Sequence, residues 1–183
     1  MSELDILIFA PHPDDAEIGM AGSILLWRKE GARIGIVDLT RGELGTKGDV
    51  ESRTQEAEEA SRRLGLVLRE NLDLGDGRLI DDESSREKIA NRIRMYRPRV
   101  VFVTPDFDRH PDHEAANKLV KAAFFLARLP KYHGDEHAHS VNAWYNYFIH
   151  DMHRVSFVVD ITSVWPQKVD VLKAYRSQFV EGE

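Results

Sequence analysis

Apolar residues gather in short runs along this chain, and each run has the length of a β-strand. We expect strands at residues 4–10, 33–39, 68–74, 99–105, 143–149 and 156–161. The run RVVFVTP at 99–105 is the clearest, because it is β-branched, apolar and bounded by prolines. The first run, LDILIFA, is apolar at nearly every position. This profile indicates a strand buried on both faces, as in a parallel sheet.

Segments with a helical spacing of apolar residues alternate with these runs. We expect helices at residues 16–31, from about 52 to 64, at 84–97, from 112 to about 129 and at 163–179. Gly31 follows the last turn of the first helix and suits its C-terminal cap. Ser52 and Gln55 have the spacing of a capping box for the second. The alternation predicts an α/β fold: a three-layer, doubly wound (Rossmann-like), mostly parallel sheet with helices on both faces.

Length and composition narrow the classes of function. The 183 residues contain no repeat or linker, so we expect one domain, 1–183. The net charge of -6 disfavours a nucleic-acid partner. The absence of cysteine excludes disulfides and thiolate metal sites and fits a reducing cytoplasm, where we expect the protein to act. The N-terminus lacks the basic region of a signal peptide, and no apolar stretch approaches the ~20 residues of a membrane helix.

Two polar segments follow strands that should be neighbours. PHPDD at 11–15 comes after the first expected strand, and DFDRHPDH at 106–113 comes after the fourth. In the doubly wound order 3-2-1-4-5, strands one and four lie side by side, and ligands bind beyond their carboxyl ends. We therefore expect the two segments to face each other across one crevice.

The residue types in these segments suit a divalent cation. A dinucleotide site needs glycines in the first turn, and Asp14 and Asp15 would repel a pyrophosphate. His12, Asp15 and His113 make a His₂Asp set, which with an open fourth position is the arrangement of catalytic zinc. Either aspartate alone can instead cap the first helix. The second His-Pro-Asp sequence at the facing strand end favours a site.

Other side chains near the crevice are candidates for substrate contact. His110 and Asp112 accompany His113, and one histidine can ligate a metal while another, oriented by a carboxylate, polarises a substrate. Arg53 lies in the first turn of the expected second helix, where a cation opposes the helix dipole. It is either a surface arginine or a contact for an anionic or polar substrate group. Arg109 can bind a carboxylate or pair with a nearby aspartate.

The motifs PHPDDAEIG and HPDH resemble the PIG-L/LmbE-like family of zinc-dependent N-acetylglucosamine deacetylases. Three further stretches resemble its bacillithiol-biosynthesis branch, which removes the acetyl group from N-acetylglucosaminyl-malate: ESRTQEAEEASRRLGL, RENLDLGDG and SFVVDIT with KAYRSQF. The resemblance covers nearly the whole chain. Family members usually continue beyond the YRSQF segment, so the resemblance implies a C-terminal tail that this chain lacks.

The resemblance also implies a role for each site residue. It implies zinc on His12, Asp15 and His113, with Fe²⁺, Mn²⁺ or Co²⁺ as possible substitutes. Asp14 would be the general base that takes a proton from water and returns it to the leaving amine. His110 would be the electrostatic partner of the oxyanion, and Asp112 would orient His110. Arg53 would contact the substrate. A homo-oligomer built from trimers is implied as well.

Alternative functions remain open at this point. Another N-acetylglucosamine conjugate, of the inositol, chitobiose or glycopeptide type, would leave the metal segments unchanged. A His₂-carboxylate set also holds Fe(II) in oxygenases, although a second carboxylate beside the metal suits hydrolysis better. A non-catalytic metal-dependent sugar-binding module would have no use for Asp14 as a base.

Overall fold

The computed structural model describes residues 3–134 and 136–179, and its centre is one five-stranded sheet. The strands are β1 (Ile6–Ala10), β2 (Ile34–Asp38), β3 (Leu68–Asn71), β4 (Val100–Val103) and β5 (Ala143–Asn146). Every neighbouring pair is parallel, in the order β3-β2-β1-β4-β5. The expected strand order is therefore confirmed, and β1 and β4 are neighbours at the switch point.

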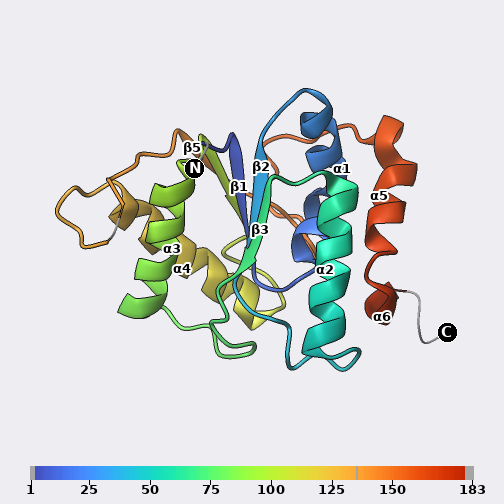
Figure 1. The fold of residues 1–183 in the computed structure, drawn as a ribbon, viewed down its shortest axis with the longest axis horizontal. Helices are drawn as coiled ribbons and strands as arrows, with labels where there is room; N and C mark the ends of the chain where they lie inside the picture. Colours follow the sequence, from blue (N-terminus) through green and yellow to red (C-terminus); the bar gives the residue numbers. More distant parts are fainter. Residues whose placement is uncertain (1–2, 135, 180–183) are drawn as a thin grey trace.

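Helices cover both faces of this sheet, as the alternation of elements predicts (Figure 1). One face carries α1 (Asp15–Lys29), α2 (Val50–Leu64) and α5 (Trp165–Leu172), and the other carries α3 (Glu83–Tyr96) and α4 (Pro111–Ala127). The three-layer, doubly wound fold is confirmed. Among the residues that the structure describes, no helix is long and apolar enough to cross a membrane.

The apolar first run becomes a strand that two cores share. Every residue of β1 is buried. Leu7 and Phe9 belong to the apolar cluster under α3 and α4, whereas Ile6 and Ile8 belong to the cluster under α1 and α2. Successive side chains of a strand point to opposite faces, so a strand between two helical layers has to be apolar throughout. This packing fixes the end of β1, where the first polar segment begins.

A buried ion cluster ties α1 to β2 and β3. Arg69 of β3 donates to both carboxylate oxygens of Asp38, at 2.7 and 2.9 Å, and also pairs with Glu17 of α1. The Glu17 side chain is fully buried and accepts a further hydrogen bond, 3.0 Å long, from the Tyr175 hydroxyl. The arginine thus pairs with two buried carboxylates close to the first polar segment, while Glu17 Oε2 has no hydrogen-bond partner among the described residues.

The expected strand at 156–161 is wrong. These residues form no strand, and β5 itself ends at Asn146 rather than at residue 149. A strand exists only where the backbone pairs with a neighbour. No backbone–backbone hydrogen bond joins residues 148–160 to the rest of the described chain.

The expected helix at 163–179 is broken into a 3-10 turn (η1, Thr162–Val164), α5 and α6 (Arg176–Phe179). The break falls at Tyr175, whose ring is completely buried while its hydroxyl reaches Glu17. A continuous helix is interrupted where the chain turns this side chain inward. This correction matters because Tyr175 belongs to the packing behind the site.

The second helix begins earlier than its sequence pattern predicts. Asp49 is the N-cap: its carboxylate accepts from the Ser52 amide at 2.8 Å, and the Ser52 hydroxyl bonds the Asp49 amide at 2.9 Å. The capping box is therefore Asp49 with Ser52, and not Ser52 with Gln55. An aspartate is as good an N-cap as a serine. Arg53 is buried, so its side chain lies on the inner side of this helix. Gly31, with φ 89°, ends the first helix as expected.

Candidate active site

The first polar segment is a short connection held in place by Thr40, which follows β2. The carbonyl of Pro11 accepts hydrogen bonds from the Thr40 amide at 3.0 Å and the Thr40 hydroxyl at 2.9 Å. The helix starts at Asp15, and Asp14 before it has φ 111°, a conformation that residues with side chains rarely adopt. The Asp14 side chain makes no capping hydrogen bond. Helix capping therefore does not account for Asp14.

The second polar segment has a similar anchor. The Thr104 hydroxyl donates to the carbonyl of His113 at 2.9 Å. Pro111 occupies the first turn of α4, where its missing amide hydrogen costs nothing. His110 is the N-cap, and its Nδ1 accepts from the Asp112 amide at 3.2 Å. The helix start thus fixes both imidazoles of this segment.

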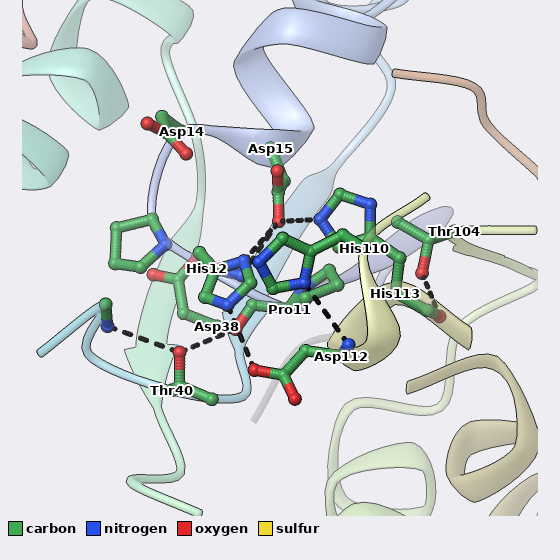
Figure 2. Close-up of polar contacts among 12 residues, drawn as sticks. Pro11, His12, Asp14, Asp15, Asp38, Thr40, Thr104, His110, Asp112 and His113 are labelled. Atoms are coloured by element: carbon green, nitrogen blue, oxygen red, sulfur yellow. Dashed lines mark hydrogen bonds and ion pairs between the residues drawn. The ribbon is translucent and has the colours of Figure 1, made fainter. Parts of the chain in front are cut away.

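The two segments meet at Asp15, as Figure 2 shows. One carboxylate oxygen, Oδ2, lies 3.1 Å from His12 Nδ1 and 3.2 Å from His113 Nε2. His110 joins them, because nitrogen atoms of the three histidines lie within 4.8 Å of one another. The expected ligand set is therefore brought together by elements that are about a hundred residues apart in the chain. Asp14 lies to the side of these contacts (Figure 2).

Each of the two ligand histidines has a second carboxylate on its other nitrogen. His12 Nε2 lies 3.0 Å from Asp76 Oδ1 and 3.3 Å from Asp112 Oδ2. His113 Nδ1 lies 3.2 Å from Asp108 Oδ1. Histidines that bind metals commonly present their far nitrogen to a carboxylate, which orients the ring and makes it a better ligand. The donor set and its surroundings therefore fit a divalent metal ion held by His12, Asp15 and His113.

The neighbouring carboxylates favour the protonated, positively charged form of His12 and His113. Burial opposes protonation of His12, but Asp112, Asp15 and Asp76 outweigh it and raise its pKa to about 10. Burial likewise opposes protonation of His113, whose pKa is nevertheless raised by Asp15 and Asp108. His110 behaves in the opposite way, since burial and the charges of the two neighbouring histidines lower its pKa. Without a metal the site therefore holds protons where the ion would bind.

The two adjacent aspartates have opposite electrostatics. Burial and the charge of Asp15 raise the pKa of Asp14, which Arg53 opposes. Burial disfavours the Asp15 carboxylate too, but His113 and His12 hold the pKa of Asp15 below its ordinary value. Arg53 Nη2 lies 3.3 Å from Asp14 Oδ2 and donates to the Pro13 carbonyl. One aspartate is thus a permanent anion, and the other can carry a proton.

The partners of Asp112 differ from those expected. Its carboxylate faces His12 and accepts a 2.7 Å hydrogen bond from the Gly77 amide. Only its backbone amide contacts His110. The reason is the position of His110 as N-cap, which turns its Nδ1 toward the helix amides. Asp112 therefore orients His12 with its side chain, and its contribution to His110 comes from the backbone.

The two arginines named from the sequence lie in different surroundings. The side chain of Arg53 is only 6% exposed and is engaged by the chain itself. Arg109 is exposed, and no ion pair joins it to another described residue. Of the two, Arg109 is the one whose guanidinium is free to meet a substrate anion.

Three residues of the site were missed by the sequence argument: Asp76, Asp108 and His150. The ring of His150 stacks on His113 at 5.4 Å, and its Nδ1 lies 2.8 Å from Asp108 Oδ1. Asp108 stands within the second polar segment, so its acidic side chain was available as a signal. Asp76 and His150 come from connections whose paths the hydrophobic pattern does not reveal.

Known proteins resemble this chain over most of its length. Residues 7–124 match the model of the PIG-L family, GlcNAc-PI de-N-acetylase. Diacetylchitobiose deacetylase of Thermococcus kodakarensis is 31% identical, over 96% of this chain and 70% of that protein. A probable N-acetyl-α-D-glucosaminyl L-malate deacetylase 2 of Bacillus subtilis is 27% identical, over 94% of this chain and 82% of that protein.

A solved structure also resembles this chain over nearly its whole length. The crystal structure of the conserved protein TT1542 from Thermus thermophilus is 45% identical, with a TM-score of 0.93, and the match covers 98% of this chain and 81% of that one. The family match includes the segments that carry His12, Asp15, His110 and His113. This chain therefore belongs to the PIG-L family of metal-dependent N-deacetylases.

Proposed function

We propose that this protein hydrolyses the N-acetyl group of an N-acetylglucosamine conjugate, with zinc held by His12, Asp15 and His113. The observation that carries the proposal is the convergence of these three side chains beside Asp14, a carboxylate that shares the crevice but is not part of the ligand set. A zinc ion held there would lower the pKa of a bound water toward about 7 and would polarise a carbonyl.

Asp14 is the proposed proton carrier. Its side chain is 13% exposed, so substrate and water can reach it while most of its surface is shielded. The raised pKa makes it a better proton acceptor than an ordinary aspartate. It takes a proton from the attacking water at its carboxylate and then delivers the proton to the amine that leaves. Arg53 holds this carboxylate in position from behind.

His110 is the proposed donor to the carbonyl oxygen. Because its Nδ1 accepts the Asp112 amide, the proton of the neutral ring resides on Nε2. The lowered pKa keeps the ring neutral in the protein without metal. A neutral N–H donor stabilises an oxyanion, so this role does not require a protonated His110 ring.

The proposed substrate is N-acetylglucosaminyl-malate. Arg109 supports an acidic aglycone, since it is exposed beside the site and suits bidentate recognition of a carboxylate. Diacetylchitobiose is a second candidate, because the relative that acts on it is 31% identical. A malate carboxylate needs a cation and a second sugar does not, so Arg109 distinguishes the two.

The test is release of free amine from N-acetylglucosaminyl-malate, diacetylchitobiose and N-acetylglucosamine by zinc-loaded protein. We expect the malate conjugate to be the best substrate and chelation to abolish its turnover. Arg109→Gln should raise KM for this conjugate at least tenfold and leave chitobiose unchanged. If chitobiose is turned over faster than the malate conjugate, chitobiose is the preferred substrate and the proposed reaction is unchanged. No amine from any of the three, with zinc bound, would contradict the proposed function.

A further inference from the structure

His150 reaches the active site although it lies outside both polar segments. It follows the end of β5, which is fixed by the Asn146 side chain, a donor to the Thr104 carbonyl at 2.9 Å. The chain then passes α1 at Gly19, where a Cβ atom would lie only 2.9 Å from the Phe148 carbonyl oxygen. A backbone approach this close requires a glycine. Specific contacts of the fold therefore determine the path that brings His150 to the site.

One oxygen atom of Asp108 contacts three histidines of the site. This atom, Oδ1, lies 2.8 Å from His150 Nδ1 and 3.2 Å from His113 Nδ1, and it accepts the His110 amide at 2.9 Å. The Asp108 side chain is only 1% exposed. Its other oxygen, Oδ2, is buried and has no hydrogen-bond partner among the described residues. The contacts of Oδ1 therefore hold this carboxylate in its orientation, and the shortest of the three is the one with His150.

The contact between His150 and Asp108 is a charge-assisted hydrogen bond. A histidine nitrogen that faces a carboxylate carries the proton, so His150 Nδ1 is the donor. Burial opposes ionisation of Asp108, but hydrogen bonds from the His110 amide and from His150 hold the pKa of this carboxyl below its ordinary value. Hydrogen bonds to an ionised group are shorter and stronger than those between neutral groups. Loss of the His150 donor therefore leaves the buried carboxylate less firmly held.

We propose that His150 is a positioning residue of the metal centre, which holds Asp108 against His113 and so sustains the affinity for zinc. This role rests on the proposed function, because it presupposes zinc on His12, Asp15 and His113. A carboxylate on the far nitrogen of a ligand histidine orients the ring, and His150 in turn holds that carboxylate in place. The alternative is a direct effect of the His150 ring on His113, since the two rings stack at 5.4 Å with an interplanar angle of 13°.

Two substitutions of His150 separate its donor from its ring. His150→Asn keeps an N–H donor at the position of Nδ1, whereas His150→Phe keeps an aromatic ring and removes the donor. We expect the dissociation constant for zinc to rise about 10–100-fold in His150→Phe and to stay within about threefold of wild type in His150→Asn. His153→Phe is the matched control, because His153 belongs to the same connection but packs on Phe107, at 5.1 Å between ring centroids. Competition with a chelator measures each affinity.

Asp108→Asn tests whether His150 acts through Asp108. The carboxylate is already lost in that variant, so adding His150→Phe should weaken zinc binding by less than about twofold further. Losses that add in the double variant would overturn the proposal, because they would assign the effect to ring stacking. So would wild-type affinity in His150→Phe, equally weak binding in His150→Asn, or a wild-type protein that binds no zinc. Amine release is measured separately: zinc-bound protein that releases no amine contradicts the proposed function and not the role of His150.

Discussion

Asp14 and Asp15 are neighbours in the chain, yet the side chains around them assign them different chemistry. Asp15 faces two imidazoles that keep it ionised. Asp14 pairs with Arg53 instead, and burial raises the pKa of Asp14 despite that charge. The left-handed backbone at Asp14, φ 111°, turns its side chain away from that of Asp15. A single unusual residue conformation thus separates the proposed metal ligand from the proposed proton carrier.

Arg53 sets the pH range in which Asp14 can accept a proton. Its charge lowers the pKa of Asp14, so removing it should raise that pKa further. Because the base acts only when ionised, the acid limb of kcat/KM should move to higher pH in Arg53→Met. Arg62→Met, an exposed arginine on the same helix, is the control. An unchanged acid limb in Arg53→Met would show that Asp14 does not titrate in that limb.

Asp108 should matter for metal affinity although it is not a ligand. It faces Nδ1 of His113, and its loss removes the group that orients this ring. We expect Asp108→Asn to weaken zinc binding about 10–100-fold, measured by competition with a chelator. Asp106→Asn, an exposed neighbour, should leave the affinity unchanged. Affinity in Asp108→Asn within twofold of wild type would contradict this role.

Among the elements, α1, β2 and β3 depend on one buried arginine. Arg69→Met would leave Glu17 and Asp38 buried without a counter-charge. Removing one member of a buried ion cluster costs about 3–5 kcal/mol in free energy of unfolding. Arg92→Met breaks a partly exposed pair with Glu70 and should cost about 1 kcal/mol or less. Denaturant titration measures the free energy of unfolding of both variants. Equal losses of stability in the two variants would contradict a special role of the buried ion cluster.

The sequence predicts well those elements whose pattern of apolar and polar residues follows directly from their packing. The run Ile6–Ala10 is apolar because two cores meet on β1. The loops after β1 and β4 converge because parallel strands share one carboxyl edge. Residues 156–161 have the pattern of a strand but no partner within the described chain. Asp76 reaches His12 through a loop of irregular path, and Tyr175 breaks a helix for a tertiary contact. The hydrophobic pattern along the chain does not reveal such long-range contacts.

At the scale of the whole molecule, metal binding and protonation compete for one site. The apo protein holds a proton on His12, whose pKa is raised to about 10, and the metal requires the neutral ring. Zinc binding at pH 7 should therefore release roughly one or more protons per ion, and affinity should rise about tenfold per pH unit for each proton displaced. Calorimetry in two buffers with different ionisation enthalpies measures the release. A binding enthalpy independent of the buffer would contradict the protonated apo site.

The measurement that tests the account most directly compares wild-type protein with Asp14→Asn for zinc content and for release of amine from the preferred conjugate. Because Asp14 is outside the ligand set, the variant should bind one zinc per chain, as wild type does. Because Asp14 is the proposed proton carrier, the kcat of the variant should fall by about 10²-fold or more. Full activity in the zinc-loaded variant would contradict the assignment of Asp14 as the general base. Loss of zinc together with activity would contradict the separation of ligand from base.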